Sequence, residues 1–498
     1  MESTGNLRGQ REKDWTSGSV TRNLLALSWP MVVTEGLYMI GISIDMIWVG
    51  KLGAAAIAGI GVAGIYAGFQ MMLMNGLGIG IRALIARFVG SGDIGQANHT
   101  GQQAFIIGVV YTVVMVILGM MLSETVLTLM GLEPDVIAVG TDYMRIMFGF
   151  GSVTVAFWLI GYSIMQASGD AVTPLAIVIL YRIIHIPLSY ALVFGWGIFP
   201  DMCASGAAMA NVISRGLGMV LVLWALFTGR TVNFNWYRWM NGWTDSRSSG
   251  NLLLRIYAFI AVWRIPSLET GRLQLTMKHF QADLAMVWRM VKIGIPASVM
   301  GVQRSLSLAI VAWLIAPFGT LAVAAHSLMQ RVEMLLMPVN LGLGMASGVL
   351  AGQNLGAGHP GRAGRGSWQA AGLSTVLMII CSVVVLAWAE EIVHIFSTEP
   401  DIVEMTSLFM RIAAAGYVVL GVGVVLGQSL SGAGDTVPPM VIGLVAGWLV
   451  TLPLAYLLPE LTDMGVLGIR WALVIGMVIT AIATISYFRL GRWKRKRV

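Results

Sequence analysis

The sequence predicts an all-α polytopic membrane protein with twelve transmembrane helices in two homologous six-helix lobes. Three observations predict this fold: an apolar composition, apolar runs of bilayer length, and an internal repeat. Of the 498 residues, 57% are hydrophobic and only 11% are charged. That charged fraction is less than half of the roughly 25% typical of a soluble domain. The composition therefore indicates a membrane protein.

The apolar runs set the number of spans. A hydrocarbon core about 30 Å thick needs roughly 20 apolar residues per helix. Twelve runs of this kind follow one another along the chain, and each is expected to form one span. The predicted spans are residues 23–49, 55–80, 102–124, 140–166, 172–195, 205–229, 294–316, 322–350, 369–389, 406–432, 437–458 and 466–488.

Charged residues alternate between the loops. Basic residues gather in both tails and in the central segment 230–292, whereas acidic residues such as Glu133 and Glu399 occupy the loops between. Because cytoplasmic loops are enriched in Lys and Arg, we expect a multi-pass protein of the plasma (inner) membrane with both termini in the cytoplasm. The net charge of +7 then reflects topology, and no nucleic-acid partner is expected.

An internal repeat divides the chain. The stretch "VGSGDIGQA", beginning at Val89, returns as "LGAGHPGRA" 266 residues later. The same offset pairs "EPD" at 133–135 with "EPD" at 399–401, and an offset of 265 pairs "ASGDAVTP" with "GAGDTVPP". Two six-helix halves that both enter from the cytoplasm form a parallel repeat about an axis along the membrane normal. Transporters built this way hold substrate between the halves, near the bilayer midplane.

The repeat and the charges predict five segments along the chain. These are a cytoplasmic tail (1–22), an N-lobe (23–229), a cytoplasmic linker with an amphipathic helix at 251–265 (230–293), a C-lobe (294–488) and a basic cytoplasmic tail (489–498).

The glycines of the first repeated stretch have the spacing of a dinucleotide-binding loop, Gly90-x-Gly92-x-x-Gly95. That interpretation requires a preceding strand and an acidic residue about 20 positions later, and the sequence offers neither. We interpret the repeated stretches as cytoplasmic turns, in which Asp93 caps the next helix. Asp170 and Asp435 are predicted to cap helices after the second pair of turns. No cofactor is expected.

Asp45 is the most informative ionisable residue, because a charge inside a span is costly unless it is paired or used. It lies about 7–8 Å from the outer end of the first span, at 1.5 Å per residue. Its repeat partner is Val311, so the symmetric fold does not require a carboxylate there. Asp45 is therefore a candidate for binding the coupling ion. The alternative is a helix-end carboxylate satisfied by neighbouring hydroxyl groups.

Other polar residues fall inside spans. Glu35 lies on the same helix as Asp45, about 80° away around the axis, so the two need not share a site. His185 and Ser189 are four residues apart on one helix face. For Arg304 and Glu333, an interhelical ion pair and cavity lining are both open. We assign these residues to a substrate cavity: Glu35, Tyr38, Asn75, Arg182, Gln303, Arg304 and Glu333.

The motifs together resemble those of multidrug and toxic compound extrusion transporters. They are "LSWPMVVTEGLYMIGISIDMIWVGKLGAAAIAGIGVAG", the paired turns "QASGDAVTP" and "SGAGDTVPP", and "MPVNLGLGMASGVLAGQNLGAG". The resemblance implies an antiporter that exports organic, often cationic, amphipaths in exchange for H⁺ or Na⁺. It places the family's first-span aspartate at Asp45, and further cation-site positions at His185, Ser189 and Asn211. Arg304 stands where some Na⁺-coupled members have a glutamate, and Leu420 near their tenth-span aspartate.

We therefore expect a secondary active multidrug exporter that works by alternating access. H⁺ is the favoured coupling ion, with Na⁺ near Asp45 as the alternative. The expected partners are small-molecule drugs or toxic organic compounds and the lipid bilayer, and a monomer is assumed. A lipid-linked oligosaccharide or lipid flippase of the same superfamily is an alternative function, as is a channel or scaffold. Enzyme activity is not expected, because the sequence has no nucleophile–base set, metal cluster or P-loop.

Overall fold

The computed structural model describes residues 14–233, 267–278, 280–496 and 498. Within them, twelve helices are long and apolar enough to cross a membrane, which confirms the predicted fold. The main helical elements are α1 (Val20–Gly50), α2 (Ala54–Ser91), α3 (Ile94–Leu129), α4 (Pro134–Phe148), α5 (Phe150–Ser168), α6 (Val172–Phe194), α7 (Cys203–Thr228), α10 (Leu284–Ile315), α11 (Thr320–Gly356), α12 (Pro360–His394), α13 (Pro400–Gly432), α14 (Val437–Leu444), a π-helix (Val445–Thr451), α15 (Leu452–Leu461) and α16 (Val466–Leu490). The short helix α4 is not one of the twelve, and α14, the π-helix and α15 together form one span.

The predicted fourth span, 140–166, is wrong as one continuous helix. The chain breaks at Gly149, whose backbone (φ −71°, ψ −102°) is not helical, so α4 and α5 are separate. The repeat-equivalent residue in the C-lobe, Ala415, lies inside the unbroken helix α13. Several helices also extend beyond the predicted spans. For example, α10 begins at Leu284, where the Asp283 carboxylate accepts a hydrogen bond from the N–H of Met286 at 3.0 Å.

The linker is described only at its ends. Strand β1 (Arg230–Asn233) pairs antiparallel with β2 (Ser267–Thr270), with Arg230 opposite Thr270. The predicted amphipathic helix at 251–265 lies outside the described residues. Beyond β2, the N–H of Met286 and the ring of His99 hold the pKa of Asp283 below its usual value. Because His99 is on α3, this contact ties the start of α10 to the N-lobe.

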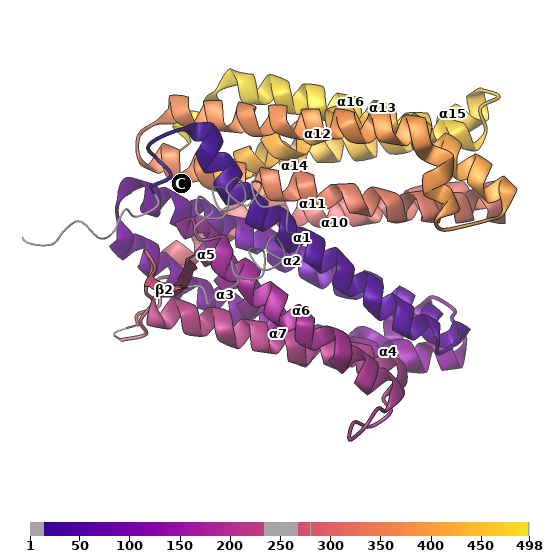
Figure 1. Cartoon of the computed structure of the whole chain (residues 1–498), viewed down its shortest axis with the longest axis horizontal. Helices are drawn as coiled ribbons and strands as arrows, with labels where there is room; N and C mark the ends of the chain where they lie inside the picture. Colours follow the sequence, from indigo (N-terminus) through magenta and orange to yellow (C-terminus); the bar gives the residue numbers. More distant parts are fainter. Residues whose placement is uncertain (1–13, 234–266, 279, 497) are drawn as a thin grey trace, which may run out of the picture.

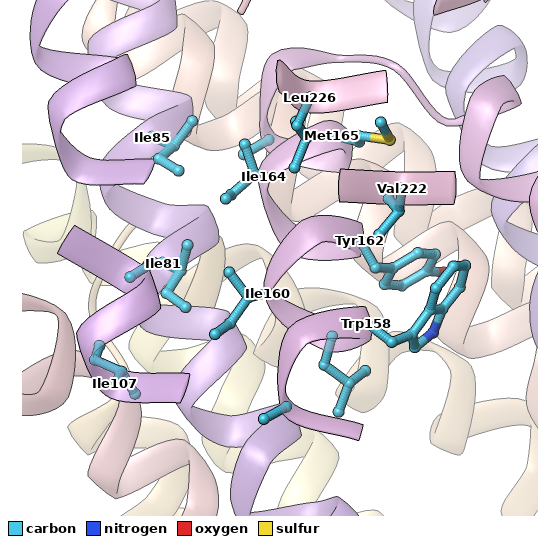
Figure 2. Close-up of a cluster of buried hydrophobic side chains, with 14 of the residues drawn as sticks. Ile81, Ile85, Ile107, Trp158, Ile160, Tyr162, Ile164, Met165, Val222 and Leu226 are labelled. Atoms are coloured by element: carbon cyan, nitrogen blue, oxygen red, sulfur yellow. The ribbon is translucent and has the colours of Figure 1, made fainter. Parts of the chain in front are cut away.

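The core of the N-lobe forms around α5, which lies between α2 and α7. Figure 2 shows Ile160 and Ile164 of α5 directed toward α2, and Tyr162 directed toward α7. Gly161 lets α7 approach closely, because a Cβ there would lie 2.7 Å from a methyl group of Val222. Small residues at such contacts are the usual way in which membrane helices pack.

The two lobes lie together at one end of the bundle and diverge toward the other. In Figure 1, the N-lobe (α1–α7) and the C-lobe (α10–α16) meet where the C-terminus is drawn. We call this end the closed end and the opposite end the open end. The closest interlobe approaches occur in the halves of α1, α2, α10 and α11 that are nearer the closed end.

Glycines of the repeat make these approaches possible. A Cβ on Gly90 would lie 2.0 Å from the backbone oxygen of Gln353, and a Cβ on Gly356 would lie 2.1 Å from that of Arg87. The repeat relates the two contacts, because Gly90 corresponds to Gly356 and Arg87 corresponds to Gln353. Helices α2 and α11 therefore cross on the pseudo-twofold axis. Gly90 lies inside α2 and Gly356 is the last residue of α11. The prediction that both belong to turns is therefore wrong. The turns themselves use Gly92 and Gly358, both at positive φ.

Two of the three predicted caps are confirmed. Asp93 accepts a hydrogen bond from the N–H of Gln96 at 3.0 Å, and Asp170 accepts from the N–H of Val172 and Thr173. The prediction for Asp435 is wrong, because its carboxylate has other partners.

The basic tail holds Asp435 and bridges the lobes at the closed end. Lys496 Nζ lies 3.2 Å from one Asp435 oxygen, and the Tyr487 hydroxyl donates to the other at 2.7 Å. Arg87 of α2 donates to the backbone oxygens of Ala433 and Lys496, at 2.9 and 3.0 Å. Trp493, between these contacts in the sequence, is fully buried. The segment predicted as a basic tail is thus packed against both lobes.

We predict that Gly90→Ala destabilises the protein, because its Cβ would overlap the Gln353 backbone rather than a movable side chain. The midpoint of thermal unfolding in detergent measures the effect, and overpacking of this kind costs about 1–3 kcal/mol. Gly372→Ala on α12 is the matched control, because no atom lies within 4 Å of its Cβ position. An equal effect of both substitutions would show that the α2–α11 crossing does not hold the lobes together.

Candidate functional site

Asp45 lies where three helices of the N-lobe meet, five residues before α1 ends at Gly50. Its carboxylate accepts a hydrogen bond from the Ser189 hydroxyl at 2.8 Å and another from Asn211 Nδ2 at 2.6 Å. His185 Nε2 lies 3.3 Å from Asp45 Oδ1, in a geometry that makes no hydrogen bond. The structure thus brings together all four residues that the sequence analysis assigned to the cation site.

The local sequence explains this convergence. His185 and Ser189 are one turn apart on α6, and both side chains are fully buried. Asn211 comes from α7, which packs against α6 as its neighbour in the chain. Because α1 contributes only the carboxylate, hydrogen-bond donors from α6 and α7 fix the position of Asp45.

Arg182 determines which ring nitrogen of His185 carries the proton. The guanidinium donates to His185 Nδ1 at 3.3 Å and to the backbone oxygen of Tyr38 at 3.4 Å. Arginine has no lone pair to offer, so Nδ1 must accept, and a neutral His185 carries its proton on Nε2. That N–H faces Asp45. The guanidinium also lies over the rings of Tyr38 and Tyr181, at 5.8 and 5.2 Å from their centroids.

Gly41 is a site residue that the sequence analysis missed. A Cβ on Gly41 would lie 1.9 Å from Arg182 Nη1, so the guanidinium rests directly on the α1 backbone one turn before Asp45. The sequence gives no signal for this contact, because it requires knowing how α6 crosses α1. Arg215 of α7 was also missed, and it interacts electrostatically with Asp45. A signal for Arg215 existed, since a charge inside a span marks a candidate site.

Glu35 belongs to a different group of residues nearer the closed end. It accepts a hydrogen bond from the Tyr162 hydroxyl at 3.4 Å and interacts electrostatically with Arg82. Arg82 donates to Gln166 of α5 at 3.2 Å. Glu35 and Asp45 therefore have different partners.

In the C-lobe, Arg304 and Glu333 form no ion pair, which removes one of the two alternatives left open. Glu333 accepts a hydrogen bond from the Tyr417 hydroxyl at 3.1 Å, and Arg304 Nη2 lies 3.4 Å from the sulfur of Met337. The sequence analysis missed a buried Arg470–His326 contact beside them, between α16 and α11. Arg470 interacts electrostatically with Glu333.

Gln303 and Asn75 complete the predicted cavity residues. Gln303 accepts a hydrogen bond from Trp448 Nε1 at 3.0 Å, and Trp448 lies in the π-helix. Isolated π-turns occur most often at functional sites. Asn75 on α2 is exposed.

The lobes pack closely at the closed end. A cavity there has a volume of about 10 Å³, which is close to the space of one water molecule. It is lined by Ile79 and Arg82 from the N-lobe and by Met345, Gly348, Val349, Gln428 and Gly432 from the C-lobe.

Comparison with known proteins identifies relatives along the whole chain. The MatE family model matches residues 30–191 and again residues 296–457, and these matches are offset by the repeat distance. The probable multidrug resistance protein NorM of Thermotoga maritima is 20% identical over 96% of this chain and 94% of its own length. The FAD transporter of Shewanella oneidensis is 24% identical over 94% of both chains.

Solved structures share the fold. An outward-facing multidrug resistance MATE family transporter of the MOP superfamily superposes with a TM-score of 0.83 at 18% identity, covering 98% of this chain and 100% of its own. The Vibrio cholerae MATE transporter VcmN superposes with a TM-score of 0.80 at 20% identity, covering 97% and 100%.

We predict that Gly41→Ala expels the Arg182 guanidinium from α1 and breaks its bond to Tyr38. Because the displaced group is the end of a flexible side chain, the loss of unfolding free energy should be about 1 kcal/mol, the net contribution of one hydrogen bond. A double-mutant cycle with Arg182→Gln measures the coupling from thermal unfolding in detergent. Gly36→Ala, on the same helix with no atom within 4 Å of its Cβ position, is the control. Additive effects of Gly41→Ala and Arg182→Gln would contradict the contact.

Proposed function

The chain belongs to the MatE family of multidrug transporters, and from this premise we propose that it is a secondary active exporter that exchanges small organic amphipaths for inward H⁺. The proposal rests on one observation above all. Asp45, inside a membrane span, is held by Ser189 and Asn211 and faced by His185. A carboxylate that the structural repeat does not require, held by donors from two other helices, is suited to binding and releasing a cation.

The residues around Asp45 favour a proton over Na⁺. Ser189 and Asn211 both direct hydrogen-bond donors at the carboxylate, and His185 Nε2 lies 3.3 Å from it without forming a hydrogen bond. Hard metal cations need oxygen lone pairs instead. Arg182 and Arg215 interact electrostatically with Asp45 and would also repel a bound metal ion. In the C-lobe, Arg304 occupies the position where some Na⁺-coupled members have a glutamate, which supports coupling through the N-lobe.

We propose alternating access as the mechanism. The closed end, with both tails, would face the cytoplasm, and Asp45 would be reached from the open end. Protonation of Asp45 would then release its donors on α6 and α7 and change the relative stability of the two access states. A ligand shifts such an equilibrium only through its different affinity for the two states.

The proposed substrates are drugs and toxic organic compounds. The Shewanella oneidensis relative named as a FAD transporter adds a dinucleotide to the substrates worth testing for this chain.

We predict that Asp45→Asn abolishes gradient-driven transport and leaves folding intact, because the amide keeps the shape of the carboxylate but cannot bind a proton or cation. The measurement is dye transport by the purified full chain in liposomes, under a pH gradient or a Na⁺ gradient imposed separately. Asp401→Asn, in the exposed first turn of α13, is the matched control. Thermal unfolding checks that both variants fold.

Transport that is driven by the pH gradient alone and lost only in Asp45→Asn supports the proposal. Transport driven only by Na⁺ would replace the proton with a metal ion. Full transport by Asp45→Asn would mean that the carboxylate is structural, and this mechanism would fail.

A further inference from the structure

Resting on the proposed exporter function, we propose that the transported compounds are organic anions whose negative group pairs with Arg304 between the lobes.

Positive charge exceeds negative charge near the key carboxylate of each lobe. In the N-lobe, Asp45 interacts electrostatically with two arginines, Arg182 and Arg215. In the C-lobe, Glu333 likewise interacts with Arg304 and Arg470. By contrast, Glu35 interacts electrostatically with one arginine, Arg82.

None of these arginines is neutralised by a direct ion pair. The salt bridges found in the described residues join His99 to Asp283, Arg145 to Glu124, His185 to Asp45, Arg411 to Glu390, and Lys496 to Asp435. The arginines around Asp45 and Glu333 are absent from this set. Unpaired charge at membrane depth is costly and marks a pathway for a ligand or ion.

Arg304 is the most accessible of the four. Arg182 and Arg470 are 5% and 2% exposed, and each is bound to a histidine. Arg304 is exposed, and within the part of the chain that the structure describes its one polar contact is the sulfur of Met337, at 3.4 Å. A thioether is a weak acceptor, whereas a guanidinium has five donors. The donors of Arg304 thus remain available to an incoming ligand.

The position of Arg304 suits a substrate held between the lobes. It lies near the middle of α10, beside two residues that touch the N-lobe. A Cβ on Gly301 would lie 3.3 Å from Met72 of α2, and the Ser305 hydroxyl donates to the Met72 sulfur at 2.8 Å. Met337 contacts the guanidinium, and Met72 contacts the neighbouring Ser305. Methionine side chains are polarisable and adapt to varied ligands.

A carboxylate, sulfonate or phosphate matches this site. Such groups accept two parallel N–H bonds from one guanidinium, in the strongest class of hydrogen bond. An organic cation would instead meet two arginines and one carboxylate. An anion with an apolar body supplies the missing counterion through its charged end and packs on the methionines through its body.

The test compares two flat aromatic probes of opposite charge, carboxyfluorescein and ethidium, transported by the full chain in liposomes. We expect carboxyfluorescein to be transported faster than ethidium. Arg304→Gln should lower carboxyfluorescein transport about tenfold or more, the loss expected for one charge-assisted hydrogen bond. Arg304→Lys should restore most of it. Arg411→Gln, whose parent residue pairs with Glu390 near the open end, is the control and should transport normally. The thermal unfolding midpoint checks that each variant folds.

Fluorescent phosphatidylglycerol in the same liposomes tests whether the anion is a lipid headgroup. Translocation of this lipid that depends on Arg304, with no dye transport, would support the anion site and overturn export of soluble compounds. Transport of ethidium without carboxyfluorescein would overturn the anion inference and leave the exporter function standing. Anion transport that is unchanged in Arg304→Gln would also overturn the inference.

Discussion

The contact of two helix backbones on the pseudo-twofold axis is the constraint on which the rest of this structure depends. Gly90 and Gly356 bring α2 and α11 so close that no side chain fits between them. A second symmetric pair extends this contact, with Gly76 against Ser298 and Gly342 against Val32. Because both pairs lie toward the closed end, the lobes are fixed there and diverge elsewhere (Figure 1). Backbone packing thus determines where the space between the lobes lies.

The residues that we propose to bind ions and substrates lie where the two halves differ. The repeat explains the glycines, the turns and the ion pairs Arg145–Glu124 and Arg411–Glu390, which occupy equivalent positions. It does not explain Asp45 opposite Val311, or Arg304 opposite Tyr38. The break at Gly149 and the π-helix at 445–451 are likewise confined to one lobe each. Gene duplication accounts for the scaffold, and the residues that we propose to contact ions and substrates lie where the halves have diverged.

Sequence reasoning predicted most of the fold and the residues around Asp45, for a physical reason. Membrane spans and buried charges leave strong signals in composition, and the pair His185–Ser189 follows from helical periodicity. Contacts between distant helices leave no such signal, so Gly41 was missed although Arg182 was named. The cap predicted for Asp435 failed because Tyr487 and Lys496 compete for the same carboxylate. Arg215, His326 and Arg470 were within reach, because each is an ionisable residue inside a helix of bilayer length.

The C-terminal tail links the two lobes at the closed end, away from the residues that we propose to bind ions and substrates. Its contacts with Asp435 and around Trp493 are made within the C-lobe, whereas Arg87 is its partner on the N-lobe. In the proposed alternating-access cycle the lobes would separate at this end, and the tail would then stay with the C-lobe and release Arg87. The free energy of that single contact adds to the stability of the closed state alone. In the proposed cycle, a change that strengthens or weakens the contact between Arg87 and the tail would shift the populations of the two access states without altering the residues proposed to bind ions and substrates.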